Sequence, residues 1–136
     1  MDQGSLVNEQ IAAQIAAAGT FLSELEKSVH VQVAFWGKDS EDGRWNLYVA
    51  PDQVDETEFY DIYGDVIRIS GEMNDPYFDP FQVKLVKWND PLAQAATDIH
   101  RRYPNRAVVR SNTHTFASFR LGEVYIYPSP AAVGGA

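Results

Sequence analysis

The 136-residue chain contains no cysteine. This absence excludes disulfides, thiolate metal ligands and a cysteine nucleophile, and it suits a reducing compartment. Long hydrophobic runs are also missing, because Glu9, Gln10 and Gln14 interrupt the apolar residues near the N-terminus, and no basic segment follows Met1. The sequence therefore predicts neither a signal peptide nor a membrane span, and we expect a cytoplasmic protein.

Catalytic motifs are missing as well: the chain has no glycine-rich phosphate loop, no nucleophile elbow and no HExxH helix. The candidate acid–base residues are Asp98, His100 and His114, but the first two lie two positions apart and so point to different sides of a helix. The carboxylates from Asp52 to Asp61 lack the spacing of a calcium-binding loop. We therefore expect no metal site and no cofactor, assign no catalytic residue, and favour a non-enzymatic protein over an enzyme.

One long segment lacks acidic residues, in a chain that otherwise has an excess of them. Positions 1–80 contain 16 acidic and 4 basic residues (net −12), whereas positions 81–136 contain 3 acidic and 7 basic residues (net +4). No carboxylate lies between Asp98 and Glu123. Five arginines do, namely Arg101, Arg102, Arg106, Arg110 and Arg120. The overall charge of −8 argues against a general affinity for nucleic acid, which basic side chains provide.

The arginine-rich segment has two interpretations. Planar guanidinium groups suit bidentate contacts with phosphate or carboxylate, so the segment is a candidate surface for an anionic ligand. Alternatively, the arginines pair with the protein's own acidic loops at 38–42 and 52–65. We favour internal pairing, because Arg101 and Arg102 end a predicted helix, where the helix dipole stabilises cations without any ligand. Of the five, Arg120 is the one we expect to touch a partner, because it alone falls on a predicted strand beside aromatic residues.

Hydrophobic periodicity predicts both helices and strands. Apolar residues at helical spacing predict an amphipathic helix over 5–27, kinked or divided at Gly19 and Thr20. Strict alternation of apolar and polar residues predicts a β-hairpin whose strands are 29–36 and 45–50.

A second helix is predicted over 55–70, although 66–69 alone resembles a strand. Asp55 and Glu58 have the spacing of a capping box, and the apolar residues that follow them keep helical spacing. Gly64 opposes this prediction, because a glycine inside a helix costs about 1 kcal/mol relative to alanine.

The C-terminal half is predicted to continue with a strand over 81–88 and a helix from about Asp90 to Arg102. Two β-rich runs follow, 113–120 and 123–127, and predict a second hairpin.

The resulting order, α-β-β-α-β-α-β-β, predicts an α+β protein. We expect a single domain over residues 1–130, with one mostly antiparallel sheet of about five strands and helices packed on it. Residues 131–136 are expected to form a mobile C-terminal tail.

The predicted strands carry aromatic residues on the side that we expect to face away from the core. Tryptophan, tyrosine and arginine are the residue types enriched where binding energy concentrates. We therefore expect a binding face formed by Trp36, Tyr48, His114, Phe116, Arg120, Tyr125 and Tyr127. The alternative is that helices or a second copy of the chain cover both sides of the sheet.

Three stretches resemble one group of proteins. These are 33–36 (VAFW), 45–51 (WNLYVAP) followed by Val54-Asp55, and 124–127 (VYIY). They are similar to small uncharacterised bacterial α+β proteins. The resemblance reaches to the end of the third stretch and implies a leading helix, an aromatic hairpin, a tyrosine-containing helix and a terminal strand. It implies no activity and no site residues, and the arginine-rich segment departs from the pattern of that group.

Three functions agree with these features. The first is a non-enzymatic protein-interaction module that binds a protein partner, or itself as a homodimer, through the aromatic face. The second is a small ligand-binding domain or enzyme with a pocket near His114 and Arg120, suited to an anionic ligand. The third is an acidic antagonist whose N-terminal half mimics nucleic acid. We expect no membrane partner and no nucleic-acid partner.

Overall fold

The computed structural model describes residues 9–52 and 54–128. Its elements are, in chain order, α1 (Glu9–Leu25), β1 (Val31–Asp39), β2 (Trp45–Pro51), α2 (Glu56–Met73), the 3-10 helix η1 (Pro80–Gln82), β3 (Val83–Leu85), α3 (Pro91–Arg102), β4 (Val108–Ser111), α4 (His114–Ala117) and β5 (Leu121–Ile126). The tail predicted at 131–136 lies outside the described residues.

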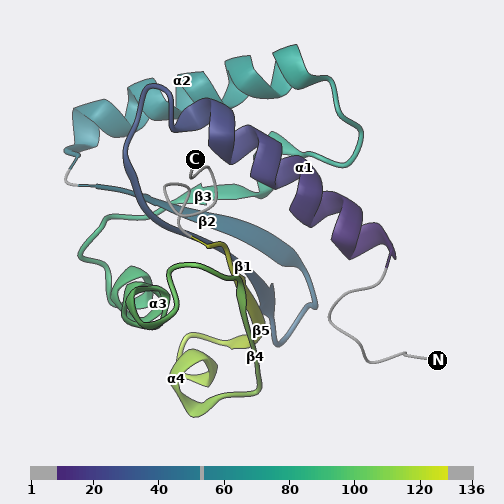
Figure 1. Cartoon of the computed structure of the whole chain (residues 1–136), viewed down its shortest axis with the longest axis vertical. Coiled ribbons are helices and arrows are strands. Elements are labelled where there is room, and N and C mark those ends of the chain that lie inside the picture. The colour runs from purple at the N-terminus through teal and green to yellow at the C-terminus, as the bar shows by residue number, and fades with distance from the viewer. Residues whose placement is uncertain (1–8, 53, 129–136) are drawn as a thin grey trace.

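The five strands form a single sheet in the order β3-β2-β1-β5-β4. β1 pairs antiparallel with β2 and with β5, and β4 pairs antiparallel with β5, whereas β3 runs parallel to β2. β1 is therefore the central strand, and β3 and β4 form the two edges (Figure 1). The predicted α+β class, with one mostly antiparallel sheet of five strands, is confirmed.

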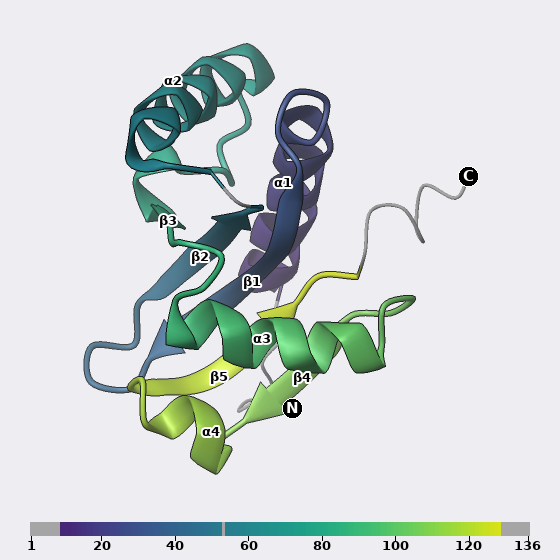
Figure 2. The ribbon, with the colours of Figure 1, turned by 90° about the vertical axis from the view of Figure 1, so that its left-hand side faces the viewer.

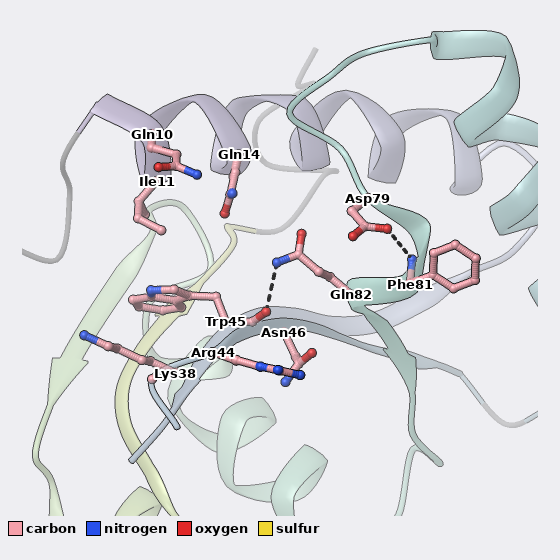
Figure 3. A pocket seen from close by; sticks show the side chains of 11 residues that line it. Gln10, Ile11, Gln14, Lys38, Arg44, Trp45, Asn46, Asp79, Phe81 and Gln82 are labelled. Atoms are coloured by element: carbon pink, nitrogen blue, oxygen red, sulfur yellow. Dashed lines mark hydrogen bonds between the residues drawn. The ribbon is translucent and has the colours of Figure 1, made fainter. Parts of the chain in front are cut away.

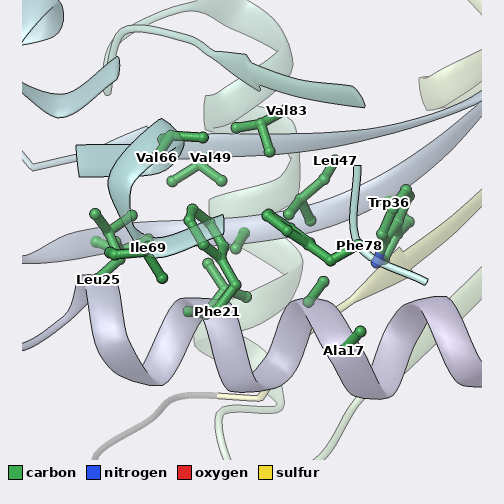
Figure 4. Packing of buried hydrophobic residues seen from close by; sticks show 14 of the residues in the cluster. Ala17, Phe21, Leu25, Trp36, Leu47, Val49, Val66, Ile69, Phe78 and Val83 are labelled. Carbon is green, nitrogen blue, oxygen red and sulfur yellow. The ribbon is translucent and has the colours of Figure 1, made fainter. Parts of the chain in front are cut away.

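Helices cover both faces of this sheet (Figure 1, Figure 2). α1 and α2 lie side by side on one face, the α1/α2 face, and α3 and α4 lie on the other, the α3/α4 face. The core of the α1/α2 face includes Phe21, Trp36, Leu47, Val66 and Phe78 (Figure 4). The core of the α3/α4 face includes Phe35, Ala96, Phe116, Leu121 and Ile126. The central strand is thus buried on both sides.

The first two helices form for reasons that the sequence contains. α1 is one helix through Gly19 and Thr20 and is not divided there: the Thr20 hydroxyl donates back to the Ala16 carbonyl (3.4 Å) and caps no new turn. At the start of α2 the capping box is complete: the Asp55 side chain accepts from the Glu58 N–H, and the Glu58 side chain accepts from the Asp55 N–H, both at 2.9 Å. The predicted second helix is confirmed, and it extends to Met73.

Two predictions for the C-terminal half need correction. The strand expected over 81–88 is limited to β3, because Asp79 caps the 3-10 turn η1 just before it. The run 113–120, expected as a strand, contains α4: the Thr113 side chain caps this helix by accepting from the Phe116 N–H (3.5 Å). The strand that pairs with β5 is instead β4, which lies earlier in the chain.

Candidate functional site

The structure brings Trp36, Tyr125 and Tyr127 together but separates them from the rest of the predicted aromatic face. In β1, Trp36 lies opposite Leu47 and Tyr125, whereas Phe35 lies opposite Tyr48. Directly opposite residues of antiparallel strands point to the same side. Trp36 and Tyr125 therefore belong to the α1/α2 face and Tyr48 to the α3/α4 face. The expected arrangement also required one uncovered side, and the helices leave none.

Trp36 and Tyr127 connect α1 to the sheet. Trp36 is 4% exposed, and its Nε1 donates a hydrogen bond to the Tyr127 hydroxyl (2.9 Å). That hydroxyl in turn donates to the Ile15 carbonyl in α1 (2.7 Å). Burial raises the pKa of Tyr127, so the phenol stays protonated. The indole and the phenol therefore use their hydrogen bonds inside the fold.

The remaining predicted site residues do not lie with Trp36 and Tyr127, and they differ from one another in burial. His114 is exposed at the start of α4, and Phe116 is buried in the core of the α3/α4 face. Arg120 precedes β5 with a left-handed backbone (φ 63°), so it lies on no strand. Its guanidinium forms an exposed ion pair with Glu41 (3.3 Å).

Arg120 is also the one arginine of the acid-free segment that pairs with a carboxylate of the described residues. Arg106 lies over the ring of Tyr103 (4.8 Å to its centroid), and Arg110 donates to the Val109 carbonyl (3.2 Å). Internal pairing, which we favoured, is therefore wrong for four of the five arginines. The reason is topological: the acidic helix α2 packs on the opposite face of the sheet and contacts the opposite edge.

The helix α2 carries apolar residues on two opposite sides. The buried residues of its inner side are Ile62, Val66 and Ile69. Its outer side exposes Tyr60 (81%), Tyr63 (42%) and Ile67 (54%). At 3.6 residues per turn, Tyr60 lies about 180° around the helix from Ile69. Tyr63 also covers the edge of the sheet, where its hydroxyl accepts from the Leu85 N–H (3.3 Å).

Two glycines complete this outer side. A Cβ atom added to Gly64 or Gly71 would meet no heavy atom within 4 Å, so packing inside the protein requires glycine at neither position. Together the residues form the outer stripe of α2: Tyr60, Tyr63, Gly64, Ile67 and Gly71. From the sequence alone, Gly64 is only a residue that opposes a helix. The missed signal is that these residues keep helical spacing opposite the core residues.

The surface around the outer stripe is acidic. α2 contains five carboxylates and one arginine. The arginine, Arg68, pairs within the helix with Asp65 (3.4 Å) and Glu72 (3.3 Å). Glu56 also pairs with Lys87 from outside the helix (3.7 Å), and the net negative charge that remains faces solvent beside the exposed apolar residues.

A cavity of about 580 Å³ lies between α1 and the tip of the β1–β2 hairpin. In Figure 3, Gln10 and Gln14 extend into it from α1, with Trp45 on the opposite side. Gln82 donates to the Trp45 carbonyl (3.1 Å), and Lys38 pairs with Glu123 (3.6 Å) outside the cavity lining.

A second cavity, of about 440 Å³, lies between α3 and the ends of β1 and β2, and is named the α3 cavity. Its lining residues are His30, Gln32, Asp52, Trp88, Gln94, Thr97, His100 and Arg101. Burial lowers the pKa of His100, against the opposite effect of the Tyr127 backbone, so the imidazole is neutral at pH 7. Neither cavity is lined by His114 or Arg120, the residues near which a pocket was expected.

Two features are absent from residues 9–52 and 54–128. No three His, Asp or Glu side chains of this part converge to hold a metal ion. None of its helices has the length and apolar character needed to cross a membrane. No protein-family model, curated protein or solved structure matches the chain. Function is therefore inferred from the geometry of this chain alone.

Proposed function

We propose that this protein is a protein-interaction module that binds a basic helical segment of another protein along the outer stripe of α2. The observation that carries the proposal is the exposed apolar stripe opposite the core side of the same helix. A surface helix of a globular protein has one apolar side, and a helix that is apolar all round is normally buried. Contiguous apolar surface that is left exposed marks an interaction site.

The two glycines support a helical partner. A glycine in a helix interior destabilises the helix by about 1 kcal/mol relative to alanine, and neither Gly64 nor Gly71 is needed for internal packing. Their spacing of seven residues corresponds to about two turns, so both lie on the same side. Small residues at such positions allow the backbone of a second helix to approach closely. Tyr60 and Ile67, beside them, provide the apolar contacts.

The charge of α2 favours a basic partner over a second copy of the chain. Two copies packed along their outer stripes would bring together two helices that each carry five carboxylates and one arginine. Like charges at about 4 Å repel by about 1 kcal/mol even in water. Lysine or arginine residues beside the apolar contacts of a partner reverse the sign of this interaction and increase the association rate.

A photo-crosslinking residue in the outer stripe tests the proposal. p-Benzoylphenylalanine replaces Tyr60, and the protein is expressed in its native host cell. The control carries the same residue at Thr115, which is exposed on the opposite face of the sheet. We expect position 60 to form adducts with a protein that position 115 does not capture. That protein is then purified, and its affinity for the wild type and for variants is measured by calorimetry.

Tyr60→Ser and Ile67→Ser should each weaken this affinity by about tenfold or more, because a few aromatic and aliphatic anchors dominate interface energies. Thr115→Ser should leave it unchanged. The proposal is contradicted if both positions capture the same proteins equally, or if neither stripe substitution changes the affinity. If the adducts join two copies of this chain, the outer stripe forms a homodimer, and the proposal of a basic partner is wrong.

A further inference from the structure

We propose that the α3 cavity binds a small metabolite that has an anionic group at one end and hydroxyl or ammonium groups along the rest. The site is independent of the outer stripe of α2, because it lies on the other face of the sheet. Its volume of about 440 Å³ falls within the range of small-molecule pockets, about 300–1,000 Å³. Such a ligand carries either a carboxylate or a phosphate, and the experiment below separates the two.

The inner wall of the cavity is held in place by hydrogen bonds. Thr97 is 2% exposed, and its Oγ1 accepts from the Gln32 Nε2 (3.0 Å). The same nitrogen donates to the Trp88 carbonyl (3.1 Å), which also accepts from the Gln94 Nε2 (2.8 Å). Because one carbonyl holds both amides, the two glutamine side chains are fixed relative to each other before a ligand binds.

This wall presents hydrogen-bonding groups to the cavity. The amide nitrogens of Gln32 and Gln94 are engaged, which leaves their oxygens as acceptors for ligand hydroxyl or ammonium groups. Thr97 accepts one hydrogen bond and keeps its own hydrogen for a ligand oxygen. Fixed acceptors of this kind favour a ligand rich in donors, since a ligand that lacks them leaves the acceptors unpaired.

The rim of the cavity supplies charges of both signs. Arg101 is exposed and pairs with no carboxylate of the described residues, so its guanidinium is available to a carboxylate or phosphate. Asp52 lies 3.9 Å from the His30 Nε2, a long contact that leaves the carboxylate able to accept from a ligand. The separation of Arg101 on the helix from Asp52 on the hairpin is what orients a ligand with one charged end.

His100 gives the cavity a polar, uncharged wall. Its Nδ1 is buried and has no hydrogen-bond partner in the described part of the chain. The Tyr127 backbone also interacts with this imidazole, so His100 is held by the fold and lines the cavity without a charge.

Calorimetric titration with defined probes tests the inference. Glucose 6-phosphate combines a phosphate with several hydroxyls, L-glutamate combines carboxylates with an ammonium group, and inorganic phosphate supplies the anion alone. We expect glucose 6-phosphate or L-glutamate to bind at millimolar concentration or below, at least tenfold more tightly than inorganic phosphate. Which of the two binds identifies the anionic group.

Adjacent arginines provide a matched control. Arg101→Gln should weaken the binding of that probe by about tenfold or more, because a charge-assisted hydrogen bond is lost. Arg102→Gln removes the same charge one position away, outside the cavity lining, and should leave the affinity unchanged. Gln94→Ala tests the inner wall from a half-buried position and should also weaken binding. Melting temperatures of all variants establish that they are folded.

Three results would overturn the inference. The first is that neither complete probe binds at millimolar concentration. The second is that inorganic phosphate binds as tightly as the complete probe, because the inner wall would then contribute nothing. The third is that Arg101→Gln and Arg102→Gln weaken binding equally, because the effect would then be one of general charge.

Discussion

The inner and outer sides of α2 carry apolar residues at similar spacing, yet the inner side is buried in the core and the outer side is largely exposed. Ile69 is 2% exposed and Ile67, two residues earlier, is 54% exposed. Gly64 and Gly71 lie on the exposed side, where nothing in the fold requires them. The inner side therefore explains the stability of the helix, whereas the outer side adds little to it and, in our proposal, serves a partner.

The largest expected difference between the two sides is in stability. Ile69→Ala should lower the free energy of unfolding by about 2–5 kcal/mol, because it removes a buried side chain and leaves a cavity. Ile67→Ala, the same substitution on the outer side, should change it by no more than about 0.5 kcal/mol. Urea denaturation followed by circular dichroism measures both. Similar losses for the two variants would show that the outer side also packs within the protein.

Replacing the two glycines of the outer stripe should raise the free energy of unfolding, whereas Ile69→Ala lowers it. The double variant Gly64→Ala/Gly71→Ala should be more stable than the wild type by about 2 kcal/mol, because alanine is the better helix former at both positions. Gly37→Ala is the control, since its Cβ would lie 2.8 Å from a Leu121 side-chain carbon and should destabilise the protein. If the double variant is less stable than the wild type, the added methyl groups must clash with other parts of the protein, and the outer stripe is not free.

The capping box stabilises the first turn of α2 and therefore the whole helix, with both its inner and its outer side. Asp55→Ala should lower the free energy of unfolding by about 1 kcal/mol, because the Glu58 N–H loses its acceptor. Asp61→Ala removes the same charge within the helix, where the side chain makes no cap, and should have a smaller effect in the same urea assay. Equal effects of the two substitutions would assign the loss to charge instead of capping.

The smallest effect concerns a histidine outside α2. Burial lowers the pKa of His100 below 6.5, so below that pH the unfolded chain binds a proton that the folded protein does not. This contribution to stability is therefore complete above pH 6.5 and decreases as the pH falls through it. His100→Gln should reduce the loss of stability between about pH 7.5 and about pH 5.5. An unchanged loss of stability in His100→Gln would contradict this assignment.

Local signals predicted much of the fold. Asp55 and Glu58 identified the start of α2, and strict alternation identified the first hairpin. The run 113–120 was misread because it satisfies two patterns at once: it is rich in β-formers, but Phe116 and Phe119 also have helical spacing behind the cap at Thr113. The packing of Phe116 into the core of the α3/α4 face decides between the patterns, and that contact is not local in sequence.

The candidate sites were less predictable than the fold. The register of the first hairpin places Trp36 and Tyr48 on opposite faces, and a shift of one residue reverses every side chain of a strand. The segregation of charge was visible in the sequence, but only the topology shows that Arg101 lies beside a cavity and Arg120 beside Glu41. A helix with two apolar sides likewise does not reveal in advance which side meets the sheet.

In our proposal, the two glycines of the outer stripe lower the stability of α2 and allow a partner helix to approach closely. The most direct test measures the affinity of the Gly64→Ala/Gly71→Ala variant for the protein captured from position 60. We predict a variant that unfolds at higher urea concentration and yet binds this partner about tenfold or more weakly, because the added methyl groups prevent close approach. A variant that is more stable and binds with unchanged affinity would contradict the account.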